Sequence, residues 1–277
     1  MLQSAQRVQV ALQTISISRE LAAHPGKGKQ PAVELIIDAT VTQNQGYEII
    51  ITKDIITLTG HDESGLAYAV TTFAQLVAGL GSTSNLPCLT ITDWPDFEKR
   101  GIMLDISRNK VPTMDTFFLL IDRMAKWKMN ELQLYTEHTF AYANHSDVWA
   151  EASPITPAEI LQLDAYGRER GIELVPNQNT FGHCENWLKH DAYAHLAECP
   201  EPTDIIAWNK PMTVSKLSLS PIDPGSLALI DELLTELLHH FTSQMVNVGG
   251  DETIELGYGR SKSKCEEIGK GRVYLNY

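Results

Sequence analysis

The chain contains little positive charge and no long apolar run. Its 277 residues include 22 lysines and arginines against 35 aspartates and glutamates, so the formal net charge is -13. This balance leaves no basic surface, and we expect neither nucleic acid nor a membrane as a partner. No apolar run is long enough to span a bilayer, and residues 1–7 contain no apolar core of a secretory signal. A small neutral or cationic substrate fits this composition better.

Cysteine is also scarce. The four cysteines are widely separated and form no Cys-x-x-Cys pair: Cys88, Cys184, Cys199 and Cys265. We expect free thiols, which are typical of a reducing compartment, and hence a cytoplasmic location. A signal peptide that had already been removed would leave the same sequence.

The first part of the sequence predicts a small α+β domain. Three segments are rich in β-branched residues and are separated by turn-forming residues: 33–37, 47–51 and 55–58. Apolar residues then recur at helical spacing between Leu66 and Val77, and Gly79 ends the run. No acids, histidines or phosphate-binding glycines gather here. We therefore expect residues 1–93 to form an accessory domain, in which one helix covers a sheet.

From Arg100 onward, short strands alternate with helices, which is typical of parallel βα units. The expected strands are 101–106, 131–135, 172–176 and 245–248. A closed (β/α)₈ barrel needs about 250 residues, so residues 94–277 can form only its first half. Residues 271–277 resemble the start of a further helix that is cut short, and we expect a fragment. The predicted fold class is α/β: an N-terminal α+β domain followed by the first half of a (β/α)₈ TIM barrel.

Ionisable and amide side chains follow each of these strands. They are Asp105 and Arg108, Glu137 and His138, Asn179 and His183, and Asp251 and Glu252. In parallel α/β architectures the ligand binds beyond the carboxyl ends of the strands. The repetition therefore predicts one pocket shared by all four strand ends.

The last pair of acids is the most informative. Residues 246–248 favour an extended, buried strand, and Gly249 and Gly250 leave room for a ligand or another backbone. An ionised carboxylate raises the proton affinity of its neighbour, so Asp251 and Glu252 can supply an anion and a proton donor together. In the alternative interpretation, Asp251 caps a following helix and Glu252 lies in its first turn.

The ordered motifs resemble glycoside hydrolase family 20, the β-N-acetylhexosaminidases. The resemblance covers most of the chain and is carried by four segments: 65–76 (Gly-Leu-Ala-Tyr to Gln-Leu), 93–105 (Asp-Trp-Pro-Asp-Phe to Leu-Asp), 175–183 (Val-Pro to Gly-His) and 247–252 (Asn-Val-Gly-Gly-Asp-Glu). The family implies hydrolysis of terminal non-reducing N-acetylhexosamine residues from β-N-acetylhexosaminides. In its substrate-assisted, retaining mechanism the acetamido oxygen of the substrate is the nucleophile.

The resemblance also implies a role for each site residue. Glu252 would act as general acid and base, and Asp251 would orient the acetamido group and balance positive charge. Arg100 would bind ring hydroxyls, and Glu137 stands where many relatives have an aspartate. His183 would hydrogen-bond Glu252, and Asn179, which replaces an aspartate of many relatives, would orient the imidazole without balancing its charge.

Two of these residues also have purely structural interpretations, and two other functions remain as alternatives. A lone histidine such as His183 is often only a satisfied buried residue, and Arg100 by itself would be a surface ion-pair residue. The rival enzyme is a metal-dependent barrel hydrolase with His138, His183 and Asp251 as ligands, although the spacing leads us to assign no metal and no cofactor. The non-enzymatic rival is a fragment that binds sugar without turnover. The expected partner is a small carbohydrate substrate.

Overall fold

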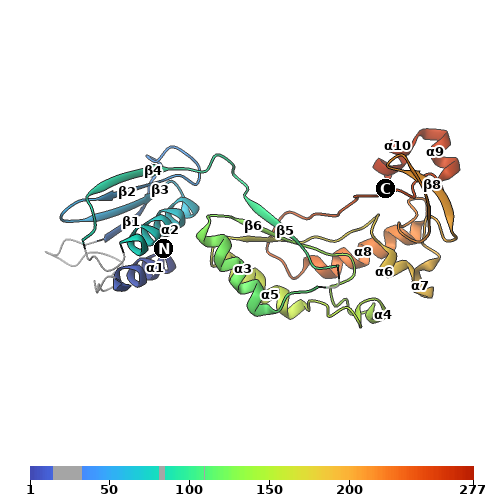
Figure 1. Ribbon diagram of the computed structural model, residues 1–277, viewed down its shortest axis with the longest axis horizontal. Helices are drawn as coiled ribbons and strands as arrows, with labels where there is room; N and C mark the ends of the chain where they lie inside the picture. Colours follow the sequence, from blue (N-terminus) through green and yellow to red (C-terminus); the bar gives the residue numbers. More distant parts are fainter. Residues whose placement is uncertain (15–32, 81–84, 109) are drawn as a thin grey trace. The chain divides into compact units, whose positions relative to one another are not determined.

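The computed structural model describes residues 1–14, 33–80, 85–108 and 110–277 and has a mixed α/β architecture (Figure 1). It divides into two compact units. The N-terminal unit comprises residues 1–100, 122–130 and 169–172, and the C-terminal unit comprises residues 101–121, 131–168 and 173–277. Among the described residues, no helix has both the length and the apolar character needed to cross a membrane.

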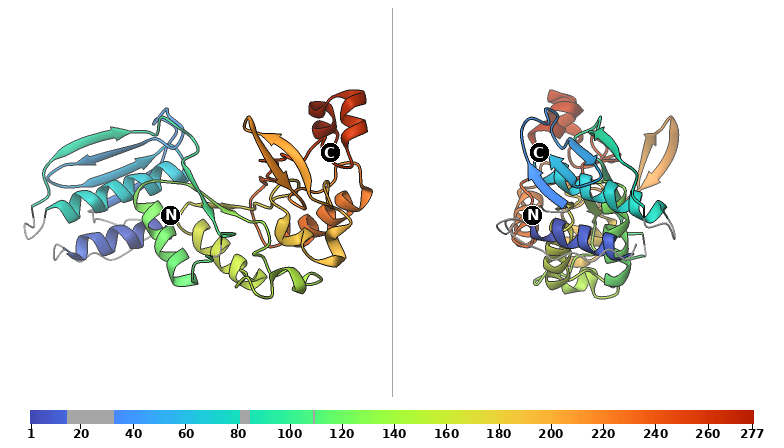
Figure 2. Two further views of the ribbon diagram at one scale, coloured as in Figure 1. Left: turned by 45° about the vertical axis from the view of Figure 1, so that its right-hand side comes forward. Right: turned by 90° about the vertical axis from the view of Figure 1, so that its left-hand side faces the viewer.

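The N-terminal unit is a four-stranded mixed sheet with two helices on one face (Figures 1 and 2). The strand order is β1-β3-β2-β4, in which β1 pairs with β3 in parallel and β2 pairs antiparallel with both β3 and β4. The bounds are α1 Leu2–Thr14, β1 Val33–Ile37, β2 Tyr47–Ile51, β3 Ile56–Gly60, α2 Glu63–Gly79 and β4 Leu89–Asp93. The predicted α+β domain is confirmed, although α1 and β4 were not among the expected elements.

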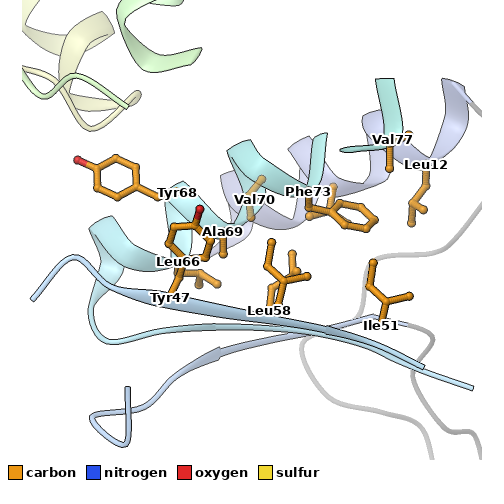
Figure 3. Packing of buried hydrophobic residues seen from close by; sticks show 12 residues of the cluster. Leu12, Tyr47, Ile51, Leu58, Leu66, Tyr68, Ala69, Val70, Phe73 and Val77 are labelled. Atoms are coloured by element: carbon orange, nitrogen blue, oxygen red, sulfur yellow. The ribbon is translucent and has the colours of Figure 1, made fainter. Parts of the chain in front are cut away.

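Apolar side chains fill the space between the helices and the sheet of this unit (Figure 3). Phe73 of α2 and Leu58 of β3 are fully buried, and Leu12 of α1 is almost so. The amino end of α2 is capped because the Asp62 carboxylate accepts a hydrogen bond from the Gly65 N–H at 2.7 Å. The sheet therefore has the sequestered face that a stable two-layer fold needs.

The C-terminal unit contains a three-stranded parallel sheet in the order β5-β6-β7. Its strands and longer helices are β5 Gly101–Asp105, α3 Met114–Lys126 (in this unit up to residue 121), β6 Glu131–Tyr135, α5 Pro157–Arg168, β7 Glu173–Val175 and α8 Pro224–Leu238. The helix α5 begins with a capping box, since the Glu159 carboxylate accepts a hydrogen bond from the Thr156 N–H at 2.8 Å. The sheet is open among the described residues, so the parallel βα region is confirmed without a closed barrel.

Shorter elements follow the strand ends. They are α4 Ser146–Trp149, α6 Glu185–Leu188, α7 Asp191–Ala194, β8 Thr203–Ala207, β9 Lys210–Val214, α9 Lys262–Ile268 and α10 Lys270–Asn276. The strands β8 and β9 form an antiparallel hairpin whose two turn residues, Trp208 and Asn209, have φ of 49° and 60°. Two consecutive positive φ angles are typical of the tight turn that suits the twist of a hairpin.

The fourth expected strand, 245–248, is not formed. A single parallel bridge joins Asn247 to Asn177, with the Asn247 N–H donating to the Pro176 carbonyl at 2.9 Å. The flanking N–H groups are taken by nearby side chains: that of Met245 donates to Ser243 Oγ at 3.0 Å, and that of Gly249 donates to Asn247 Oδ1 at 2.9 Å. These local bonds replace ladder bonds, so the pairing stops at one bridge.

The expectation that residues 246–248 are buried is also wrong. Val246 is 42% exposed and Val248 is 43% exposed. Among the described residues this segment pairs only on the side that faces residues 176–180. It is therefore an extended edge segment rather than a central strand.

Candidate active site

His183 lies at the centre of the acidic side chains that follow the strands. Its Nε2 is 3.1 Å from Asp251 Oδ2 and 3.4 Å from Glu252 Oε2, and its Nδ1 is 3.4 Å from Glu137 Oε1. The Tyr135 hydroxyl, at the end of β6, donates to Asp251 Oδ2 at 3.2 Å. One imidazole thus contacts three carboxylates, which come from two distant parts of the chain.

The backbone that presents these groups is strained. His183 has φ of 54° and Glu252 has φ of 50°, a left-handed conformation that non-glycine residues rarely adopt. Such residues typically cost about 1–3 kcal/mol each and cluster at functional sites. A Cβ atom on Gly182 would lie 2.3 Å from the Asp251 carbonyl oxygen, so the two loops meet only because residue 182 is glycine. The contact brings His183 next to the acids.

Glu137 is the buried member of the cluster. Its side chain is almost inaccessible to water, and it forms a charge-assisted hydrogen bond with Arg108 Nη1. Burial raises the pKa of the Glu137 carboxyl to about 7, against the opposing effect of the Arg108 charge. The Glu137 backbone N–H donates to Ser107 Oγ at 2.8 Å, which ties the end of β6 to the residues that follow β5.

The structure does not bring Arg100 to this cluster. Arg100 precedes β5, whereas the acids follow the carboxyl ends of the strands. Its guanidinium is held within the N-terminal unit, where it donates to the Tyr68 hydroxyl at 2.6 Å and to the Phe97 carbonyl at 2.6 Å. Arg108 is instead the arginine that contacts the site. Its position after the carboxyl end of a strand is a signal already present in the sequence.

Asn179 lies beside the cluster but makes no hydrogen bond to His183 within the described residues. Its backbone N–H donates to the Thr136 carbonyl at 2.9 Å, and its buried side-chain amide has no hydrogen-bond partner in the described part of the chain. A Cβ on Gly249 would lie 1.9 Å from Asn179 Oδ1. Gly249 thus leaves room for the Asn179 side chain, which agrees with the expected close approach at this glycine.

The described residues contain no group of three or more His, Cys, Asp or Glu side chains that could hold a metal ion. His183 and Asp251 contact each other, whereas no contact joins either of them to His138. His138 is buried, and burial lowers the pKa of its imidazole. The metal-dependent alternative therefore lacks a ligand set in this part of the chain. The four cysteines are free thiols.

Asp251 and Glu252 are open to a ligand, with side chains 48% and 55% exposed. No helix begins at Asp251, because the segment that follows forms turns and α9 begins only at Lys262, so the helix-cap interpretation is wrong. Two accessible carboxylates that share one imidazole can provide an anion and a proton donor in the same site. This arrangement can support acid–base chemistry on a bound ligand.

Comparisons with known proteins agree on one family. The sequence profile for the catalytic domain of glycosyl hydrolase family 20 matches residues 97–272, and the profile for domain 2 of the same family matches residues 2–94. The chain is 25% identical to a β-N-acetylhexosaminidase of Cellulomonas fimi over 232 residues, which are 78% of this chain and 46% of that protein. It is 28% identical to a β-hexosaminidase of Akkermansia muciniphila over 243 residues, covering 79% of this chain and 48% of that protein.

Solved structures show the same fold. An exo-β-N-acetylglucosaminidase from Vibrio harveyi, in complex with N-acetylglucosamine, superposes with a TM-score of 0.75 at 19% identity and covers 98% of this chain and 46% of that one. The N-acetyl-β-hexosaminidase of Streptomyces plicatus gives a TM-score of 0.68 at 24% identity, covering 91% of this chain and 54% of that one. The chain spans about half the length of the curated relatives it matches. It belongs to glycosyl hydrolase family 20, of which it contains domain 2 and part of the catalytic domain.

Proposed function

We propose that the parent protein hydrolyses terminal non-reducing N-acetylhexosamine residues from β-N-acetylhexosaminides, and that this chain carries its acid–base residues. The observation that carries the proposal is the convergence of Asp251, Glu252 and Glu137 on His183. Family membership and the names of the curated relatives support the substrate class. The rival hypothesis of sugar binding without turnover keeps the same residues but assigns them no proton transfer.

The proposed reaction is retaining and substrate-assisted. The acetamido oxygen of the substrate attacks the anomeric carbon while Glu252 gives its proton to the leaving oxygen, so the glycosidic bond breaks and a cyclic oxazolinium-type intermediate forms. Glu252, now ionised, removes a proton from water, and the water oxygen opens the ring at the anomeric carbon. The carboxyl group is thereby restored to its acid form.

Asp251 would act on the positive charge that develops in this step. Its carboxylate, held by the Tyr135 hydroxyl and by His183, would orient the acetamido N–H and stabilise the cationic intermediate. Because the contact partners fix the carboxylate before the substrate binds, little reorganisation is needed when the charge forms.

His183, Glu137 and Arg108 would form the supporting layer. The Glu137 carboxylate between Arg108 and the imidazole would hold the ring in position and influence its proton affinity. Arg108, whose side chain is half exposed, is the residue that we propose for binding ring hydroxyls in place of Arg100. Asn179 would position the loop through its backbone bond to Thr136 and its contact with Gly249.

We further propose that the C-terminal unit is the first half of a (β/α)₈ barrel and supplies only one wall of the pocket. Met103 of β5 is 55% exposed on the sheet face opposite the buried leucines of β6, and residues 246 and 248 are exposed at the sheet edge. Such surfaces are normally covered in a closed barrel. The relatives, at about twice the length, are consistent with a second half in the parent protein.

The test is the chemistry of the internal nucleophile in the full-length parent protein. A thiazoline mimic of the cyclised acetamido group should inhibit it, and the matching glucoside without the acetamido group should not be hydrolysed. Efficient hydrolysis of the plain glucoside, or a covalent glycosyl adduct on a carboxylate, would contradict the mechanism. Binding of N-acetylglucosamine without any turnover would favour the rival binding function.

A further inference from the structure

The N-terminal unit contains a polar cavity of its own, with a volume of about 320 Å³. It is formed by the loop between β1 and β2 and by the segment that follows β4, which lie side by side in Figures 1 and 2. The lining residues are Thr42, Gln43, Asn44, Gln45, Trp94, Pro95, Asp96 and Glu98. We call this cavity the Trp94 pocket. Its volume is at the lower end of small-molecule sites, which suits a ligand of one or two rings.

The side chains of the Trp94 pocket have the chemistry of a carbohydrate site. Trp94 is 48% exposed and offers a flat apolar surface for the C–H face of a pyranose. Gln43 and Asn44 offer amides that can donate and accept at once, and Asp96 and Glu98 offer carboxylates that accept from hydroxyl groups. A neutral sugar presents this combination of an apolar face and a rim of hydroxyls.

Hydrogen bonds to neighbouring residues hold both loops that form the walls of the pocket. The Glu98 carbonyl accepts hydrogen bonds from Gln45 Nε2 at 3.1 Å, Arg100 Nη1 at 3.0 Å and Asn130 Nδ2 at 2.8 Å. The Gln45 backbone N–H is held by Asp62 Oδ2 at 2.9 Å. These bonds fix both loops before any ligand arrives, which lowers the entropic cost of binding.

Four of the polar side chains that line the pocket make, in contrast, no such bonds within the described part of the chain. No hydrogen bond or ion pair within the described residues engages the side chains of Gln43, Asn44, Asp96 or Glu98, although the backbone of these loops is well bonded. Rigid loops that carry unpaired amides and carboxylates around an exposed indole have the makings of a ligand site. The two carboxylates also select against anionic sugars.

We propose that the Trp94 pocket is a second carbohydrate site, which binds one neutral pyranose of a glycan without hydrolysing it. It uses none of the residues of the acid cluster around His183, so it does not depend on the hydrolytic function. The affinity expected of so small and open a site is weak, with a Kd on the order of 1 mM.

The experiment is saturation-transfer NMR on the full-length parent protein with methyl β-glucopyranoside, which lacks the acetamido group that the hydrolytic site would require. Trp94→Ala should weaken binding at least about tenfold, and Gln43→Ala should weaken it less. The matched control is Trp127→Ala, which removes another exposed tryptophan of the same unit that does not line the pocket. Thermal unfolding of each variant checks the fold.

Three results would overturn the proposal. The first is no saturation transfer to the glucoside at concentrations of about 10 mM, well above the expected Kd. The second is an equal loss of binding in Trp94→Ala and Trp127→Ala, or no loss in Trp94→Ala. The third is binding of glucosamine, a cation, with no binding of the neutral glucoside, which would identify an acidic cation site instead. None of these outcomes bears on hydrolysis, because that is assayed separately on N-acetylhexosaminides.

Discussion

The two units of the chain treat charge in opposite ways. In the N-terminal unit the core is apolar, and the Lys128–Asp93 ion pair is partly exposed at its edge, where the hydroxyl of the buried Tyr47 also donates to Asp93 at 2.6 Å. In the C-terminal unit four carboxylates are buried: Glu137, Asp164, Glu198 and Glu255. Burying a carboxylate costs free energy unless it is paired or protonated. The C-terminal unit therefore carries a cost in folding stability that the N-terminal unit, with its apolar core, does not.

This difference in buried charge distinguishes the N-terminal unit, a scaffold, from the C-terminal unit, which contains the candidate active site. Glu137 is balanced by Arg108 next to the acid cluster, and Glu198 accepts hydrogen bonds from Ser261 and Ser220. Residues that depart from the apolar-core rule are thus concentrated in the unit with the strained backbone at His183 and Glu252. Departures of this kind are expected at functional sites rather than in scaffolds.

The largest effect should come from the exposed sheet of the C-terminal unit. We expect the 277-residue chain by itself to be inactive and to self-associate, because Met103, Val246 and Val248 are exposed and because, in the proposed half barrel, the rest of the pocket wall would come from the parent protein. Size-exclusion chromatography and an assay on an N-acetylglucosaminide, run beside the full-length protein, measure both. A monomeric chain that turns over substrate would show that the site is complete within these residues.

Removal of the proposed proton donor should have the next largest effect. Glu252→Gln in the parent protein should lower turnover of an alkyl glycoside by about 10³-fold, because an amide cannot donate the proton, while an activated aryl glycoside should retain most of its rate. The matched control is Glu266→Gln, an exposed glutamate on α9. Equal losses on both substrates would exclude Glu252 as the general acid.

A change in the apolar core should affect stability alone. Phe73→Ala removes a fully buried ring from the N-terminal unit and should lower the free energy of unfolding by about 3–5 kcal/mol. Val10→Ala in α1, an exposed position, should change it by less than about 0.5 kcal/mol. Urea denaturation monitors both variants. If Phe73→Ala were as mild as Val10→Ala, the contrast between an apolar scaffold and a charged unit would fail.

Much of the fold could be predicted because local pattern and tertiary packing agree. The strands 33–37, 47–51 and 131–135 have the predicted bounds. The helix α1 escaped prediction because its many polar residues hide a narrow apolar stripe, of which Val8 and Leu12 are buried. The apolar, β-branched sequence predicted a strand at 245–248. The backbone N–H groups of Met245 and Gly249 instead donate to the side chains of Ser243 and Asn247, so they form no strand-to-strand hydrogen bonds.

The site could be predicted only as a set of strand-end residues. Motif and position identified Asp251, Glu252 and His183, but the contact between His183 and Glu137 depends on loops that meet at Gly182. A motif also favoured Arg100, although only Arg108 follows the carboxyl end of β5. Periodicity reports which face a residue occupies; it does not report which residues of two distant loops touch. The roles assigned to these residues remain predictions until variants are assayed.

The smallest expected effect concerns pH and Glu255, a buried carboxylate that accepts from the backbone N–H groups of Leu217 and Ser218 at 3.2 and 2.8 Å. Burial raises the pKa of Glu255 to about 7, so the folded state holds a proton that the unfolded chain, with a pKa near 4.5, releases earlier as pH rises. The contribution of Glu255 to stability is therefore greatest below about pH 4.5 and is lost between about pH 4.5 and 7, by up to about 3 kcal/mol. The raised pKa of Glu137 changes stability with pH in the same direction.

Glu255→Gln removes one of these two titrations, so the loss of stability between about pH 4.5 and 7 should be smaller in the variant than in the wild type. Glu266→Gln should leave that loss unchanged. Denaturant unfolding at several pH values measures the difference. An unchanged slope in Glu255→Gln would mean that Glu255 is already ionised in the folded protein, and that the C-terminal unit stabilises buried charge better than its contacts indicate.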